Sequence, residues 1–168
     1  ASAPGVISIV GNKGVRSSWK PVPQNDPNKY TTDKAWPVAL DVGVDQLHSQ
    51  GIKGRGITVA VLDSGVYFSP ELLPGVSQDE LIKFMGQIDF VDNGKCDTYR
   101  GFPLGFQADG YCFETFFHSK DGFGHGSHVA GIIGNRYRDA QTGVSLGIAP
   151  EAGILSIRVL NADGIGTY

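Results

Sequence analysis

Two residues, Asp63 and His125, have neighbours in the sequence that are typical of catalytic acid–base groups. Asp63 follows the apolar, β-branched run of residues 56–62 and is itself followed by Ser-Gly. Such a run is typical of a buried parallel strand, and open α/β sheets place their active sites at the carboxyl ends of these strands. His125 lies among glycines and precedes an apolar segment, residues 129–133, that supplies one buried helix face. A carboxylate that orients a neutral imidazole is two thirds of the triad used in acyl transfer.

Three elements must fold to position this pair. The apolar patterns predict a strand over residues 56–62, a helix that begins at or near His125, and a second buried parallel strand over residues 153–160.

The flanking segments are less regular. Residues 35–50 partly fit a helix that ends at Gly51, and residues 82–91 predict a further strand. Residues 92–120 are rich in glycine, aspartate and aromatic residues and predict a long loop, which is usually functional or cross-linked.

Asp63-Ser-Gly and His125-Gly-Ser-His-Val-Ala-Gly resemble the aspartate and histidine motifs of the subtilases, the subtilisin-like serine proteases. Ser127 stands where that family more often has threonine. Residues 147–152 and 157–166 are similar to the next two family signatures, so the resemblance runs from about Trp36 to the last residue. It implies an α/β, three-layer subtilisin-like fold with a mostly parallel central sheet, of which residues 35–168 are the N-terminal portion. It also implies catalytic roles for Asp63 and His125.

The resemblance extends to the binding of polypeptide substrates. Residues after the last predicted strand are similar to the family's edge segment, which pairs with an extended peptide by strand addition. Glycines there let the substrate backbone approach closely. The substrate-binding residues implied are Leu160, Gly164, Ile165, Gly166 and Tyr168.

The nucleophilic serine of the family motif and its oxyanion asparagine are not found in these residues. We therefore expect a second chain or a C-terminal fragment to carry the serine and complete the sheet. Residues 1–16 hold a strand-like run that is either the tail of a prodomain or an ordinary N-terminal strand, and residues 17–34 read as a linker. The chain's own prodomain is thus a further expected partner.

Cys96 and Cys112 permit one intrachain pairing, which would close the long loop. We expect this disulfide, rather than two buried thiols, and with it a secreted or extracellular protein. Calcium is a candidate structural ion, with oxygen ligands among Asp89, Asp92, Asp97 and Asp109, or among Asn135 and Asp139. The alternative is that these side chains are solvated or form turns, as aspartates in polar loops usually do. The identity of any metal ligands stays open, and the predicted chemistry itself requires no cofactor.

Other classes of site fit less well. His125 and His128 are three residues apart, but no further His or Cys cluster accompanies them as a zinc site would need. We therefore expect His128 to be a structural residue that is hydrogen-bonded within the site. Gly143-Val-Ser-Leu-Gly147 matches the nucleophile elbow of α/β-hydrolases, but it lacks the strand before it and the helix after it, so Ser145 reads as a loop serine.

Composition and charge argue against some classes of protein. The 168 residues are 40% hydrophobic and carry a formal net charge of -3, which argues against a general nucleic-acid surface. No apolar run in the sequence approaches the length of a membrane span. The sequence predicts a secreted serine endopeptidase; an inactive subtilase-like interaction module or a calcium-binding surface domain are the alternatives.

Overall fold

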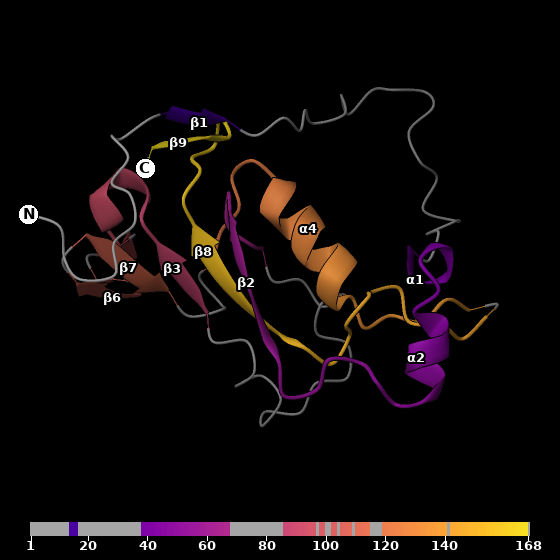
Figure 1. The fold of residues 1–168 in the computed structure, drawn as a ribbon. Helices are drawn as coiled ribbons and strands as arrows, with labels where there is room; N and C mark the ends of the chain where they lie inside the picture. The colour runs from indigo at the N-terminus through magenta and orange to yellow at the C-terminus, as the bar shows by residue number, and fades with distance from the viewer. Residues whose placement is uncertain are drawn as a thin grey trace, which may run out of the picture.

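A five-stranded mixed sheet forms the centre of the described part of the chain, in the order β2-β8-β3-β7-β6 (Figure 1). Strands β2 (Thr58–Asp63), β8 (Gly153–Arg158) and β3 (Gln87–Asp89) run parallel, and β7 (Tyr111–Glu114) and β6 (Gly105–Ala108) extend them as an antiparallel hairpin. The α/β fold class is confirmed. The computed structural model describes residues 14–16, 38–67, 86–96, 98–99, 102–103, 105–108, 110–114, 119–140 and 142–167.

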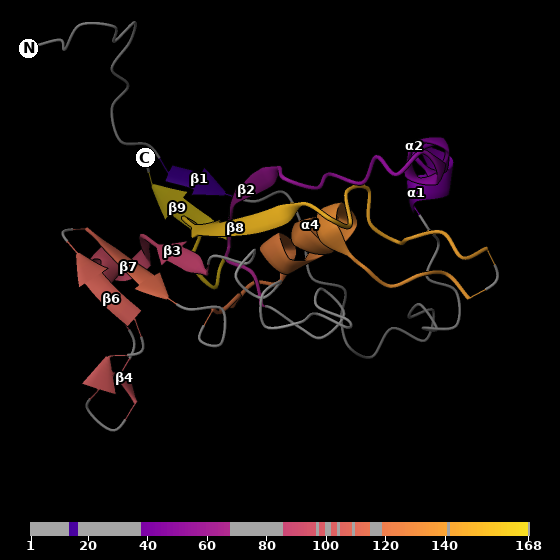
Figure 2. The same cartoon turned by 90° about the horizontal axis from the view of Figure 1, so that it is seen from below.

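Helix α4 (His125–Gly134) packs against one face of β2 and β8 (Figures 1 and 2). Small residues at four-residue intervals, Gly126, Ala130 and Gly134, are its buried positions and let the helix approach the strands closely. Ala130 joins Val61, Val66 and Ile154 in the buried core, and this packing fixes the helix on the sheet.

Shorter ladders lie outside the main sheet. Strand β1 (Gly14–Arg16) pairs antiparallel with β9 (Ile165–Thr167), so a segment near the amino end lies beside one near the carboxyl end (Figure 1). Strand β4 (Thr98–Tyr99) pairs with β5 (Phe102–Pro103), after the short 3-10 helix η2 (Val91–Gly94).

The single helix predicted over residues 35–50 is wrong. Two short helices, α1 (Val38–Asp41) and α2 (Asp45–Ser49), stand there instead. Gly43 has a φ of 72°, a left-handed conformation that turns the chain between them and that glycine adopts at little cost.

The loop predicted over residues 92–120 is wrong where β6 and β7 form. Strand β7 pairs with β3, with Cys112 opposite Asp89. The pairing depends on a strand partner from elsewhere in the sequence, which local composition does not reveal. Strand β3 itself covers residues 87–89 of the predicted 82–91; residues 82–85 lie outside the described residues.

Among the residues that the structure describes, no helix is both long and apolar enough to cross a bilayer. Most of the predicted amino-terminal segments, residues 1–13 and 17–34, lie outside the described part.

Candidate active site

Asp63 and His125 lie in hydrogen-bonding contact. His125 Nδ1 and Asp63 Oδ2 are 2.7 Å apart. Asp63 is the last residue of β2, and His125 is the first residue of α4, so the packing of helix on strand brings the two side chains together. Asp63 is buried, with 8% of its surface exposed, whereas the His125 side chain is 26% exposed. The pair therefore has one partner held in the interior and one accessible from solvent.

The second oxygen of Asp63 is also engaged. Asp63 Oδ1 accepts a hydrogen bond of 2.7 Å from the backbone N–H of Ser64. With one oxygen on the following peptide and the other on His125, the carboxylate is held in a single orientation. A carboxylate that accepts from Nδ1–H leaves Nε2 of the imidazole as the basic nitrogen.

Asp121 joins the end of β2 to the start of α4. Its Oδ1 accepts hydrogen bonds from the Ser64 hydroxyl at 2.8 Å and from Gly124 N at 2.7 Å. Its Oδ2 accepts from both the backbone N–H and the hydroxyl of Ser127, at 2.8 and 2.6 Å. Asp121 thus satisfies donors in the first turn of α4, which have no partner within the helix, and ties the same turn to Ser64.

The same hydrogen bonds set the protonation of Asp121. Burial by itself raises the pKa of this carboxyl, but the hydrogen bonds from Ser127, Gly124 and Ser64 outweigh burial. The pKa of Asp121 is accordingly held below its ordinary value of 3.8, and the group is a carboxylate at neutral pH.

Two glycines let the strand end and the helix start approach each other. A Cβ on Gly126 would overlap the carbonyl oxygen of Gly65, and a Cβ on Gly65 would overlap the carbonyl oxygen of Lys120. The space between the strand end and the helix start is taken by the Ser64 hydroxyl, which accepts from Gly126 N at 3.0 Å. Larger residues at these positions would separate Asp63 from His125.

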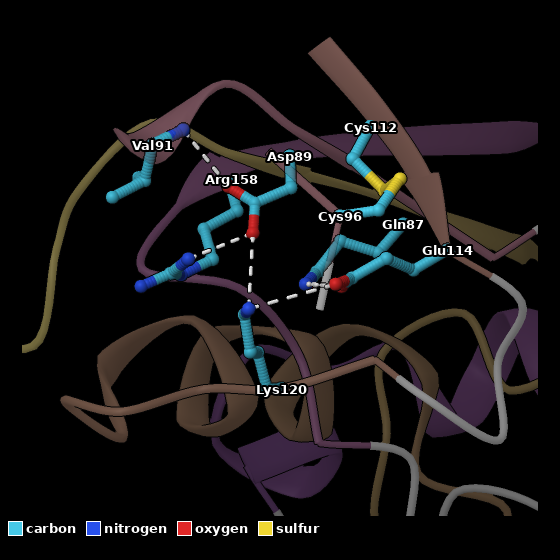
Figure 3. The surroundings of a disulfide bond; sticks show 8 residues. All are labelled: Gln87, Asp89, Val91, Cys96, Cys112, Glu114, Lys120 and Arg158. Carbon is cyan, nitrogen blue, oxygen red and sulfur yellow. Dashed lines mark hydrogen bonds and ion pairs between the residues drawn. A yellow bond between two sulfur atoms is a disulfide. The ribbon is translucent and has the colours of Figure 1, made fainter. Parts of the chain in front are cut away.

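A buried polar cluster supports this region from the neighbouring strands (Figure 3). Gln87 Oε1 accepts from the Val66 N–H and the Ser156 hydroxyl, and Gln87 Nε2 donates to Glu114 at 2.9 Å. Arg158 Nη1 lies 2.7 Å from Asp89 Oδ2. Val66 closely follows Asp63, so the amide of Gln87 anchors the turn that leaves the strand.

Lys120 connects the cluster to the segment before α4. Its Nζ lies 3.7 Å from Asp89 Oδ2 and 3.6 Å from Glu114 Oε1 (Figure 3). Asp89 and Glu114 are each only 1% exposed, so the nearby cations offset two buried carboxylates. Because Asp121 is the next residue after Lys120, these ion pairs also fix the approach to His125.

The predicted disulfide between Cys96 and Cys112 is present, with 5.1 Å between the Cα atoms (Figure 3). It joins the chain after η2 to β7, and so closes part of the segment that was expected to need a cross-link. A loop of this size is stabilised by about 3 kcal/mol in the chain-entropy description.

One of the predicted substrate-binding residues, Leu160, contacts Asp63 through the backbone. The carbonyl oxygen of Asp63 accepts from the N–H groups of Val159 and Leu160, at 2.8 and 3.1 Å. Leu160 and Gly164 are buried, and Ile165 and Gly166 lie in β9. Tyr168 lies outside the described residues.

The calcium prediction finds no support at Asp89, because the carboxylate is paired with Arg158 and also accepts from Val91 N. Asp139 Oδ1 accepts from the N–H and hydroxyl of Thr142 and closes a turn. Asn135 Oδ1 likewise accepts from Tyr137 N. The Asp92 side chain, Asp97 and Asp109 lie outside the described part. Within that part, no three His, Cys, Asp or Glu residues are grouped as metal ligands.

His128 is not part of the pair's surroundings. The prediction that His128 is hydrogen-bonded within the site is wrong. Its side chain is exposed on α4, and the described residues contain no hydrogen-bond partner for its ring. Asp121 and Ser64, in contrast, were given no role from the sequence. An acidic residue shortly before a helix is a capping signal and was the available clue to Asp121.

Comparison with known proteins identifies the family that the motifs around Asp63 and His125 resemble. A sequence model described as the subtilase family matches residues 54–168. Subtilisin DY of Bacillus licheniformis is 32% identical over 127 residues, which are 76% of this chain and 34% of that protein. Thermitase of Thermoactinomyces vulgaris is 30% identical over 145 residues, 86% of this chain and 36% of that protein.

A crystal structure of MycP1 from Mycobacterium smegmatis matches with a TM-score of 0.44 and 24% identity, covering 90% of this chain and 30% of that one. The chain spans about a third of the length of the curated relatives described above. Since the family match covers more than half of the chain and includes both Asp63 and His125, the chain belongs to the subtilase family.

Proposed function

We propose that this chain is part of a serine endopeptidase, in which Asp63 and His125 act with a serine donated from outside the described residues. The observation that carries the proposal is the 2.7 Å contact between His125 Nδ1 and Asp63 Oδ2 at the carboxyl end of β2. His125 Nε2 would take the proton of the serine hydroxyl as its oxygen attacks the peptide carbonyl, and would then give it to the leaving amine. Asp63 would hold the imidazole in the required tautomer and stabilise its charged form. This chemistry uses protein groups alone and needs no cofactor.

Replacement of His125 by alanine in the full-length protein tests the proposal. We expect peptide hydrolysis to fall by several orders of magnitude and labelling by a serine-directed phosphonate to be lost. His128→Ala is the matched control, because it removes an exposed histidine from the same helix three residues later. Near-normal hydrolysis by His125→Ala would rule out the role. An unlabelled but folded wild-type protein would favour the inactive interaction module instead.

The edge of β9 is the proposed binding site for polypeptide substrates. Gly14–Arg16 already pairs with Ile165–Thr167 as an antiparallel strand, which supports the capacity of this edge to accept an extended peptide. We propose that substrate takes the same place and that residues 1–16, as the tail of a prodomain, must leave first. Val15→Pro removes a backbone N–H from the β1 segment and should lower the KM for a peptide substrate relative to Val15→Ala. Equal KM values for the two variants would argue against competition for β9.

The rest of the sheet, with the serine, is proposed to come from a C-terminal fragment or a second chain. Strand β2 is an edge strand of the sheet, and Ile57 and Leu62 next to and within it are 60% and 63% exposed. Exposed apolar side chains on a strand whose outer backbone groups are unpaired are normally covered. Isolation of the native protein followed by mass spectrometry of its polypeptides would distinguish the two sources of the covering segment.

Secretion is proposed on the strength of the Cys96–Cys112 bond, because structural disulfides persist in oxidising compartments. Detection of the protein only in a reducing cytosol, with free thiols at both positions, would contradict it.

A further inference from the structure

We propose that a basic hollow at the opposite end of the β2–α4 unit binds a phosphate group. The hollow has a volume of about 190 Å³ and is lined by Lys53, Arg55, Arg136, Arg138, Ser145 and Glu151, together with Pro150. Four cationic side chains against one carboxylate leave a net of three positive charges in a chain whose own formal charge is -3. A single water molecule occupies about 30 Å³ of liquid, so the hollow has room for a multi-atom anion.

The hollow is remote from the Asp63–His125 pair. Lys53 and Arg55 precede β2, whereas Asp63 ends it, and a six-residue strand is about 20 Å long at ~3.3 Å per residue. Arg136 and Arg138 follow the carboxyl end of α4, whose first residue is His125. The proposed site is therefore separate from the place where peptide hydrolysis would occur.

The lining groups keep hydrogen-bonding capacity for an anion. Arg138 donates through Nη1 to the carbonyl oxygen of Gly143 at 3.2 Å, which uses one of the five donors that a guanidinium carries. Ser145 is only 6% exposed, yet its hydroxyl has no hydrogen-bond partner in the described part of the chain, although it lines the hollow. Because Ser145 lines the hollow, its hydroxyl can donate a hydrogen bond to an anion oxygen.

Glu151 holds two of the cations in place. Its carboxylate lies 2.9 Å from Arg55 Nη2 and 3.9 Å from Lys53 Nζ. One carboxylate offsets only one of the four charges, so it orders part of the wall without neutralising the hollow. Guanidinium groups match the oxygens of phosphate in a bidentate manner, and Arg136 and Arg138 add two guanidinium groups to the lining of the hollow.

A second hollow of about 200 Å³ shares Lys53, Arg138 and Ser145 with the first. Its other lining residues include His48, Ser49 and Thr142. This adjoining space would admit an organic group attached to the phosphate, so both free phosphate and a phosphate ester are sources to be tested.

Calorimetric titration of the full-length protein with inorganic phosphate, at constant ionic strength set with chloride, tests the proposal. We expect saturable binding with one site. Arg138→Ala should weaken it about tenfold or more, and Ser145→Ala should weaken it a few-fold without any change of charge. Glu151→Gln should tighten it, because it removes the one opposing carboxylate. Lys95→Ala removes an exposed cation outside the hollow and is the control, with unchanged affinity expected.

The outcomes are distinct from those of the protease proposal, because none of these variants touches Asp63 or His125. Non-saturable binding, or affinities that follow net charge alike in Arg138→Ala and Lys95→Ala, would overturn the site. Titration with phosphoserine identifies the source: binding at least as tight as that of inorganic phosphate assigns a phosphate ester, and weaker binding assigns the free anion. The unfolding temperature of each variant without phosphate controls for folding.

Discussion

At the scale of single residues, the Asp63–His125 contact depends on a third carboxylate. Asp121 accepts hydrogen bonds from Ser64, the neighbour of Asp63, and from the backbone on both sides of His125. The geometry of the pair is therefore determined by hydrogen bonds to a residue that would not itself react. Asp121 is a positioning residue in the proposed reaction.

Replacement of Asp121 by asparagine should separate positioning from binding. The amide keeps the shape of the side chain but loses the charge and one acceptor, so we expect kcat to fall about tenfold with KM little changed. Stability should fall by about 1.5–3 kcal/mol, the range for hydrogen bonds to a charged group. Asp139→Asn is the control, because Asp139 also accepts two hydrogen bonds but in a turn far along the chain. A fall in kcat in both variants would mean that the effect is one of stability alone.

Acid stability should report the same carboxylate. The pKa of Asp121 is lower in the folded protein than its ordinary value of 3.8, so the unfolded chain takes up the proton first as the pH falls. The stabilisation by Asp121 is complete above that ordinary value and is lost as the pH falls through the folded value. Denaturant unfolding between pH 6 and pH 3 should show the wild-type advantage over Asp121→Asn shrinking below about pH 4. A constant difference over this range would contradict the assignment.

At the scale of elements, the site depends on how closely α4 packs on β2. The helix presents glycine and alanine to the strands at four-residue intervals, and the carbonyl oxygen of Gly65 fills the space beside Gly126. Strand and helix thus meet backbone to backbone at Gly65 and Gly126, which closely follow Asp63 and His125.

Gly126→Ala should disrupt this packing. Its methyl group would overlap the Gly65 carbonyl oxygen, which is backbone and cannot rotate away, so we expect a loss of about 1–3 kcal/mol or more. Hydrolysis should fall with it. Gly131→Ala in the same helix meets nothing within 4 Å and should be neutral or stabilising by up to about 1 kcal/mol. Chemical denaturation of the two variants measures the contrast; equal stabilities would show that the helix can shift without cost.

At the scale of the whole molecule, the sheet has two different edges. The hairpin of β6 and β7 extends one side and is tied to the chain after η2 by the Cys96–Cys112 bond. On the other side, β2 is an edge strand in which every second residue, Thr58, Ala60 and Leu62, is exposed. The family relationship, together with this exposed edge, is the reason to propose that further polypeptide covers β2.

Leu62→Asp tests whether β2 is covered in the complete protein. Leu62 is 63% exposed in the described chain, so a charge there should be tolerated if the strand remains bare. If further polypeptide packs on it, the buried charge should cost at least about 2 kcal/mol and reduce thermal stability. Phe106→Asp is the control on the opposite edge strand, where the phenylalanine is 70% exposed and we expect a change within about 0.5 kcal/mol. Equal effects of the two substitutions would contradict the proposed covering.

The sequence by itself was enough to identify the family, the α/β class and the strand–helix pair that carries Asp63 and His125. The strand and helix follow from local patterns: an apolar run that ends at an acid, and a glycine-rich start to an apolar helix. The family follows from the resemblance of the motifs around Asp63 and His125 to those of the subtilases. The Cys96–Cys112 pairing was predictable because the chain has only two cysteines.

Only the tertiary structure decided the remaining features, because each depends on partners that lie far apart in the sequence. Strand β7 forms where it can pair with β3, and Asp121 acquires its role from Ser64, 57 residues away. The basic hollow is formed by the segments before β2, after α4 and before β8. The local sequence pattern predicts only loops in these segments and does not indicate that they lie together in the folded chain. Local patterns specify helices and strands through the backbone preferences of the residues and the spacing of the apolar side chains. The contacts between these elements depend on how they pack in the folded chain.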